Sequence, residues 1–170
     1  MRMSLLAAVP VVALLVLGSA GCEDSDGNTA TTGAPAGANS STSSNVDLCT
    51  ILTAARATEL IGQGATPDDQ TAKKCSYQES SSGSSVSAQY YPDSSGSQYD
   101  ISHSLGSASL KVDVTGVGDK AFFRTDLETL YVRKNGTDLI VQLVTQDTIR
   151  NSSDALAPTK QLAQDIVAKF

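Results

Sequence analysis

An Asn-Gly pair at 135–136, flanked on both sides by alternating apolar residues, restricts how this chain can fold more than any other part of its sequence. Asn-Gly suits the two-residue type I′ turn of a β-hairpin, because both central residues of that turn need positive φ. Counting outward from the turn pairs Lys134 with Thr137 and Arg133 with Asp138. The apolar residues of the two strands then share one face: Leu130, Val132, Leu139, Val141 and Leu143. We expect that face to be buried, and Arg133 and Asp138 to form an exposed pair of little energetic weight on the opposite face.

A second hairpin is predicted earlier in the chain. Residues 75–79 and 84–91 lie on either side of a Ser/Gly turn. Val86, Ala88 and Tyr90 alternate with polar residues along the second segment, as in a strand with one buried face.

Helices are predicted near both ends of the same region. Thr53 can cap a helix over residues 54–61, which a glycine ends. Residues 155–168 have apolar side chains at helical spacing. The sequence therefore predicts an α+β domain over residues 46–170, with a mainly antiparallel sheet and a helix near each end.

Residues 1–21 have the features of a secretory signal peptide. Arg2 gives a positive start, an apolar run covers residues 5–17, and small residues follow up to Cys22. The run is shorter than the ~20 residues that a membrane-spanning helix needs. We therefore expect export rather than a membrane span.

The five residues Gly-Ser-Ala-Gly-Cys at 18–22 resemble the lipobox of bacterial lipoproteins, in which the Cys becomes the lipidated first residue of the mature chain. Ser19 departs from that pattern, which usually has an aliphatic residue there. The alternative is ordinary signal cleavage that leaves Cys22 as a thiol. Three cysteines are an odd number for an exported chain, and acyl chains such as palmitate on Cys22 leave Cys49 and Cys75 as an even pair. We expect those two to form a disulfide in an oxidising compartment.

Residues 22–45 are predicted to be a flexible tether that begins at the lipidated Cys22. After that cysteine the segment holds small and polar residues and no large apolar side chain, so it cannot offset the entropy of ordering. As a coil it would span about 25–30 Å. The expected location of the protein is thus the extracytoplasmic face of the cell membrane, with the domain held away from the lipid.

Charge and composition exclude several function classes. The chain has a formal charge of -6 and a pI near 4.6, which argues against nucleic acid as a partner. His103 is the only histidine, so a Ser-His-Asp triad would need it as its base, and no G-x-S-x-G elbow occurs. A zinc site is not expected from one His and two paired cysteines. Asp68, Asp69 and Asp93 could hold calcium only weakly, since none starts a calcium-loop motif, and we expect solvated turn carboxylates instead.

Residues 116–121, Gly-Val-Gly-Asp-Lys-Ala, match the letters of a dinucleotide-binding fingerprint. That motif needs a helix after its glycines, whereas Phe122, Phe123 and Arg124 favour a strand. We therefore expect a turn that Asp119 caps through its own side chain, and no cofactor.

Several short motifs occur in a characteristic order along the domain. They are Cys49-Thr-Ile-Leu-Thr, Leu-Ile-Gly62, Cys75-Ser-Tyr and Val114-Thr-Gly-Val-Gly-Asp-Lys-Ala121, followed by a strand pair and a closing helix. Behind a lipoprotein signal and a tether, this order resembles the actinobacterial lipoproteins catalogued as domain of unknown function 3558. Tyr77 departs from that family, in which Trp often follows closely after the second Cys. The resemblance implies an exported lipoprotein with a Cys–Cys bridge and no established activity; a Mog1/PsbP-like sandwich is a more distant likeness.

Two function classes remain open from the sequence. The favoured one is a non-catalytic binding or sensor module whose partner is an envelope protein, a glycan or a small apolar ligand. The alternative is an envelope hydrolase whose active site is assembled from distant residues. A concave site with converging polar groups would discriminate between them.

Overall fold

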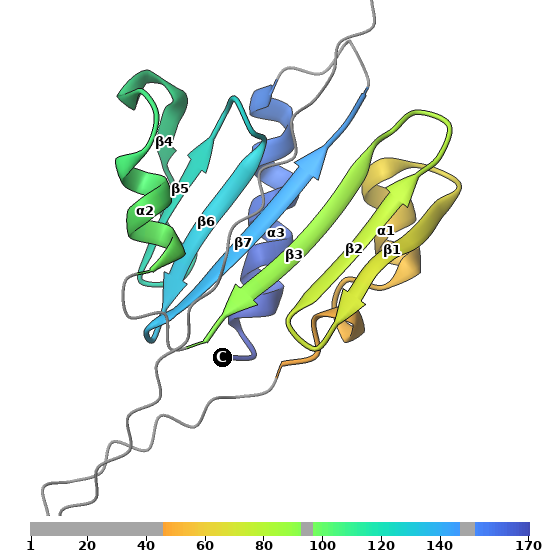
Figure 1. Cartoon of the computed structure of the whole chain (residues 1–170), viewed down its shortest axis with the longest axis horizontal. Coiled ribbons are helices and arrows are strands. Elements are labelled where there is room, and N and C mark those ends of the chain that lie inside the picture. Colours follow the sequence, from red (N-terminus) through yellow and green to blue (C-terminus); the bar gives the residue numbers. More distant parts are fainter. Residues whose placement is uncertain (1–45, 93–96, 147–151) are drawn as a thin grey trace, which may run out of the picture. The chain divides into compact units, whose positions relative to one another are not determined.

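Seven strands form one antiparallel sheet in the part of the chain that the structure describes. The structure is a computed structural model, and it describes residues 46–92, 97–146 and 152–170. The strands lie in the order β1-β2-β3-β7-β6-β5-β4 (Figure 1), and each neighbouring pair is antiparallel. Their bounds are β1 (Ala65–Thr71), β2 (Lys74–Glu79), β3 (Ser85–Tyr91), β4 (Lys111–Asp113), β5 (Lys120–Arg124), β6 (Thr129–Lys134) and β7 (Thr137–Val144).

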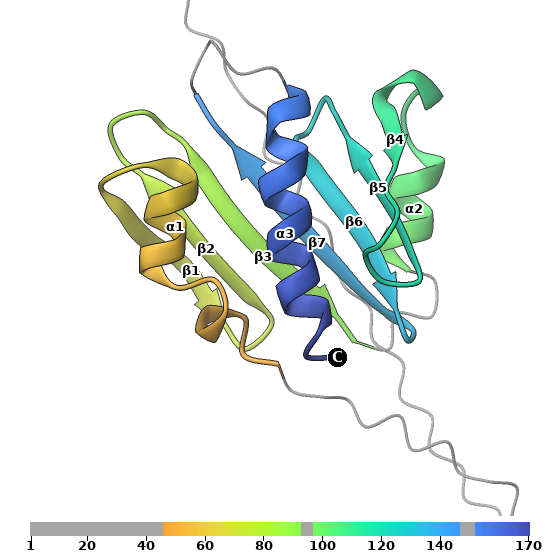
Figure 2. The ribbon, with the colours of Figure 1, turned by 180° about the vertical axis from the view of Figure 1, so that it is seen from behind.

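The helices are divided between the two faces of the sheet. α1 (Ala54–Ile61) and α3 (Leu156–Val167) cover one face, which Figure 2 shows in front. α2 (Gln98–Ser104) lies on the other face, against β6. Three short 3₁₀ turns complete the described elements: η1 (Leu48–Thr50), η2 (Ala108–Leu110) and η3 (Ser152–Ala155). The predicted α+β class, with a mainly antiparallel sheet and a helix near each end, is confirmed, and α2 is an additional helix between them.

The β6–β7 hairpin has the predicted turn and register. Asn135 and Gly136 have φ of 51° and 78°, as a type I′ turn requires. Lys134 pairs with Thr137 and Arg133 with Asp138. The predicted core side chains are each at most 1% exposed: Leu130, Val132, Leu139, Val141 and Leu143. They form the main core with residues from α1 and α3, so the hairpin is the centre of the packed layer.

α1 begins and ends where the sequence predicts. The Thr53 hydroxyl accepts a hydrogen bond from Arg56 N at 3.3 Å, and Gly62, with φ of 101°, follows the last helical residue. Ala57 and Ile61 lie on the buried side of the helix and belong to the main core. A short helix such as this is stabilised mainly by that packing.

β1 is a strand that the sequence did not predict. Its residues include Pro67, Asp68 and Asp69, which are depleted in strands, and its pairing with β2 is interrupted between Pro67 and Gln70. An edge strand tolerates these features, because the backbone groups on its outer side have no neighbouring strand to pair with. Proline and a bulge at an edge also hinder pairing with another chain. The prediction that Asp68 and Asp69 lie in a turn was therefore wrong, since they lie at the irregular part of this edge strand.

The Arg133–Asp138 pair is not exposed, contrary to the sequence prediction. α2 covers this end of the second face, where Tyr99, Phe122 and Tyr131 form a small second core. Asp138 is only 1% exposed, and its Oδ1 accepts a hydrogen bond from Arg133 Nε at 2.9 Å. The prediction failed because it assumed that only one face of the hairpin is buried.

Candidate functional site

The face of β2, β3 and β7 that lies opposite α1 and α3 is covered by no helix of the described residues (Figure 1). Side chains alternate along these strands, and Val86, Ala88 and Tyr90 of β3 point into the main core. The residues between them therefore point to the uncovered side. We call the following group the open face: Gln78 of β2, Ser85, Ser87, Gln89 and Tyr91 of β3, and Gln142 of β7.

The open face consists of neighbouring side chains in register. Ser87 lies opposite Gln142 of β7, and Ser85 lies opposite Gln78 of β2. All members except the exposed Gln78 are half-buried. They therefore form a strip of hydroxyl and amide groups across three strands, with the aromatic ring of Tyr91 at one end of β3. On β7 the apolar Ile140 and Val144 flank Gln142 on the same face, opposite Gln89 and Ser85.

Most polar side-chain atoms of the open face make no hydrogen bond within the described protein. Gln142 Nε2 donates to the carbonyl of Leu127 at 3.1 Å. Among residues 46–92, 97–146 and 152–170, the side chains of Ser85, Ser87 and Gln89 have no such partner. Donors and acceptors that have no protein partner can form hydrogen bonds with a ligand instead of with water.

Charged groups next to the open face are paired with each other. Lys74 Nζ lies 2.9 Å from Asp69 Oδ2, and this carboxylate is the main reason that the pKa of Lys74 is raised. At the other side Arg133 pairs with both Asp138 and Asp100, and hydrogen bonding to Arg133 lowers the pKa of Asp100. The members of the open face are therefore uncharged, and the cations at its border, Lys74 and Arg133, are paired with carboxylates.

A hollow of about 380 Å³ continues the open face beyond Gln142. Its other lining residues come from the β5–β6 turn and the end of β7: Thr125, Asp126, Leu127, Glu128, Val144 and Thr145. Asp126 is paired with Arg124 at 2.5 Å, which lowers the pKa of that carboxyl. Glu128 has a positive φ of 49° and accepts a hydrogen bond from Thr145 N at 3.4 Å. The hollow thus offers hydroxyls, carboxylate oxygens and the apolar Leu127, which is 40% exposed.

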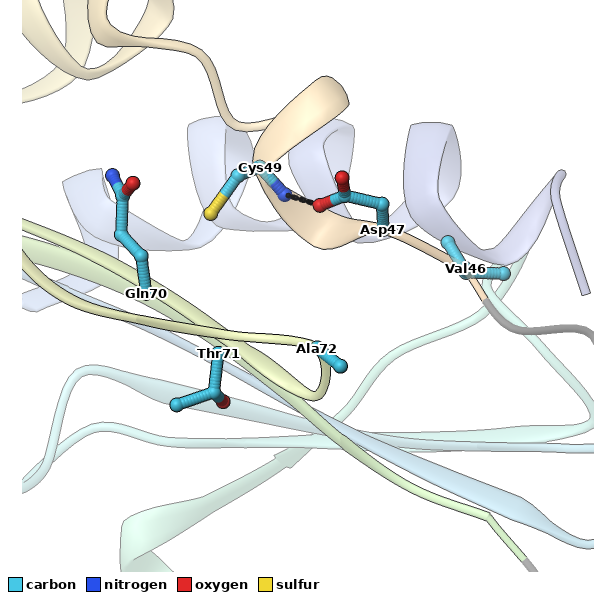
Figure 3. A pocket seen from close by; sticks show the side chains of 6 residues that line it. All are labelled: Val46, Asp47, Cys49, Gln70, Thr71 and Ala72. Atoms are coloured by element: carbon cyan, nitrogen blue, oxygen red, sulfur yellow. Dashed lines mark hydrogen bonds between the residues drawn. The ribbon is translucent and has the colours of Figure 1, made fainter.

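A larger hollow of about 460 Å³ lies beside the disulfide, between η1 and the β1–β2 turn (Figure 3). Cys49 and Cys75 are joined, as predicted, and link η1 to β2. The carboxylate in this hollow, Asp47, accepts a hydrogen bond from Cys49 N at 3.0 Å and so caps η1. That carboxylate therefore serves the fold by capping η1.

Residues 116–119 form a turn that leads directly into β5, and no helix follows the glycines. Gly118 has φ of 59°, and a Cβ there would lie 2.5 Å from the Arg133 carbonyl oxygen. Asp119 does not cap its own turn as predicted. Its carboxylate accepts hydrogen bonds from Asn135 N at 2.8 Å and from Lys134 Nζ at 3.0 Å, which lowers the pKa of Asp119. The segment therefore fixes the β6–β7 turn.

His103 lies exposed on α2, where its ring packs against aromatic side chains. The ring stacks on Tyr99 with centroids 5.9 Å apart and meets Phe122 edge-on at 5.0 Å. Among the described residues, no carboxylate or hydroxyl hydrogen-bonds to this imidazole. The contacts of His103 are those of a packing residue on α2.

The remaining site residues predicted from the sequence either form no metal-binding cluster or lie outside the described residues. Within the described part of the chain, no three His, Cys, Asp or Glu side chains come close enough to hold a metal. The signal peptide, Cys22, the tether and Asp93 lie outside the described residues. The open face was missed at the sequence level, although the alternation along residues 85–91 already separates its polar side chains from the buried ones.

None of the helices among the described residues is long and apolar enough to cross a membrane. Comparison of the chain with protein-family models, curated proteins and solved structures finds no significant match.

Proposed function

We propose that this protein is a lipid-anchored binding module on the extracytoplasmic face of the cell membrane, and that the open face is its binding surface. In this proposal the mature chain begins at Cys22, which carries acyl chains, and residues 23–45 hold the domain away from the membrane. The chain would be one of the actinobacterial lipoproteins catalogued as domain of unknown function 3558.

The sequence supports the anchor. An apolar run too short to span a bilayer precedes a lipobox-like segment that ends at Cys22. The Cys49–Cys75 disulfide agrees with an oxidising compartment, where such bonds persist. Two or three acyl chains hold a protein stably on a membrane, whereas one chain holds it only marginally.

The open face carries the binding proposal. It is a strip of half-buried polar side chains, and Ser85, Ser87 and Gln89 have no hydrogen-bonding partner among the described residues. Packing of the main core does not require these particular side chains on the opposite face of the sheet. An array of unpaired donors and acceptors on rigid strands instead suits recognition of a polar partner, because little ordering entropy is lost on binding.

The anchor is tested with Cys22→Ser. We expect this variant to leave the membrane fraction and appear in the soluble extracytoplasmic fraction. If it stays with membranes at the level of the unchanged protein, acyl chains on Cys22 are not the anchor.

The binding surface is tested separately, with envelope material from which lipid has been extracted. We expect the detergent-solubilised full chain to be retained by this material, and Ser87→Lys to reduce retention. Ala55→Lys, which adds the same charge on an exposed position of α1 across the sheet, is the matched control and should be retained normally. Equal retention of the two variants would contradict the proposed surface.

A further inference from the structure

We propose that the partner of the open face is a neutral glycan whose hydroxyl groups hydrogen-bond to Ser87, Gln89 and Gln142. This inference rests on the proposed binding function and adds the chemical class of the ligand. It follows from three properties of the surface: the kind of polar group that it presents, its lack of net charge, and the hollow that continues it.

The polar groups of the open face are hydroxyls and amides, which both donate and accept hydrogen bonds. A Gln side chain offers two donors and a carbonyl acceptor, and a Ser hydroxyl offers one donor and two lone pairs. Sugar hydroxyls are likewise donors and acceptors at once. Ser87 lies opposite Gln142, and Gln89 is two residues further along β3, so these groups can contact successive hydroxyls of one chain.

The absence of net charge on the open face favours a neutral ligand. The nearby Lys74 is compensated by Asp69 at 2.9 Å, and Arg133 is compensated by the buried Asp138. Neither of these two cations is left unpaired to attract an anionic polymer. The carboxylates of Asp126 and Glu128 in the adjoining hollow disfavour anions further, while carboxylate oxygens accept hydrogen bonds from neutral hydroxyls.

The two ends of the open face add features that suit a sugar chain. At one end the half-buried ring of Tyr91 offers an apolar face with a polar tip. At the other end Gln142 joins the hollow of about 380 Å³, where Leu127 supplies an apolar wall. Pyranose rings have both an apolar face and a polar rim, so one extended oligosaccharide fits both ends.

A polypeptide partner is disfavoured by the edges of the sheet. Extended peptides commonly bind by adding a strand to a free edge. Here the β1 edge has Pro67 and an interrupted register, and the β4 edge is only three residues long.

The experiment is calorimetric titration of the full chain, kept in a detergent without a sugar headgroup. The probes are neutral hexasaccharides of glucose, mannose and galactose, an anionic hyaluronan hexasaccharide, a cationic chitosan hexamer, and a neutral Ser/Gly peptide. We expect at least one neutral hexasaccharide to bind and each charged oligosaccharide to bind more weakly. Ser87→Lys should weaken that binding about tenfold or more, and Gln142→Ala about threefold to tenfold, because each removes hydrogen bonds to the ligand. Ala55→Lys should bind as the unchanged protein does.

The glycan inference is overturned if no neutral hexasaccharide binds, if a charged oligosaccharide or the peptide binds more tightly, or if Ser87→Lys binds normally. Circular dichroism and thermal unfolding of each variant separate lost binding from lost folding. Retention by envelope material distinguishes this failure from failure of the proposed function. If Ser87→Lys loses retention while no neutral sugar binds, the binding surface stands and the ligand class is wrong.

Discussion

Arg133 and Asp138 face each other across the β6–β7 hairpin, with Arg133 Nε 2.9 Å from Asp138 Oδ1, and the Asp138 side chain is only 1% exposed. The same carboxylate accepts a hydrogen bond from Tyr99 N at 3.0 Å, at the start of α2. Asp100 of α2 contacts Arg133 Nη1 at 3.0 Å, and the guanidinium lies 5.2 Å from the centre of the Tyr99 ring. These contacts hold α2 on the sheet and so define one border of the open face.

Replacing Asp138 by Ala is expected to lower the free energy of unfolding by about 2–3 kcal/mol, because Tyr99 N and Arg133 lose a buried charged acceptor. Leu139→Ala in the main core is expected to lower it by about 2–5 kcal/mol. Asp165→Ala is the control, since Asp165 pairs with Arg56 on the surface and should contribute less than about 1 kcal/mol. Urea unfolding measures all three. An effect of Asp138→Ala no larger than that of Asp165→Ala would contradict the role of this carboxylate.

Local patterns predicted the β6–β7 hairpin and α1 because a few adjacent residues decide each of them. Asn135 and Gly136 specify the turn, and the alternation around them specifies the register. Thr53 and the glycine after the helix specify α1 in the same way. β1 was missed because its edge position, which a single segment does not reveal, makes Pro67 acceptable.

Contacts between distant segments explain what the sequence could not predict. Asp138 is buried because Tyr99, 39 residues earlier, begins a helix that covers it. Asp119 caps a backbone N–H that belongs to Asn135, 16 residues later. The open face has the same origin: alternation separates Ser87 from its buried neighbours, but only the placement of α2 decides which part of that face stays uncovered.

Gly118 is predicted to be intolerant of any side chain. A Cβ would lie 2.5 Å from the Arg133 carbonyl oxygen and 2.6 Å from Val132 Cγ1, and φ is +59°. Gly118→Ala should lower the free energy of unfolding by about 2–4 kcal/mol, from the clash and the left-handed backbone together. Gly136→Ala is the matched control, since φ is +78° there but nothing lies within 4 Å of a Cβ. It should lose only about 1–2 kcal/mol, measured by the same urea unfolding. Equal losses would show that the contact with Arg133 does not matter.

Glu79 is predicted to make stability depend on acidity. Its carboxylate accepts hydrogen bonds from Ser81 N, the Ser81 hydroxyl and Ser82 N, and these bonds lower the pKa of Glu79 from 4.5 to about 2. Because the folded pKa is the lower one, the contribution is complete above pH 4.5 and is lost as the pH falls toward 2.

The measurement for Glu79 is thermal unfolding of the unchanged chain and of Glu79→Gln across that pH range. The difference in Tm should be largest near neutral pH and should shrink steadily below the ordinary pKa of the carboxyl. Glu59→Gln, on the exposed side of α1, is the control and should follow the unchanged chain throughout. A difference for Glu79→Gln that stays constant with pH would mean that its hydrogen bonds do not lower the pKa.

The disulfide is predicted to stabilise the domain mainly by restricting the unfolded chain. Cys49 and Cys75 are 26 residues apart in sequence, and in the chain-entropy account closing such a loop contributes about 3.5 kcal/mol. The double variant Cys49→Ala with Cys75→Ala should lose about that amount in urea unfolding, and added reductant should destabilise the unchanged chain but not the double variant. Reduction of the folded protein should also be slow. Cys75 is fully buried, and attack on the sulfur of Cys49 would release the Cys75 thiolate into the main core.

The bond itself is tested by mass spectrometry of a non-reduced digest, which should find the two cysteine peptides joined. Recovery of both as free thiols from protein made in an oxidising compartment would refute the link between η1 and β2, and with it one support for export.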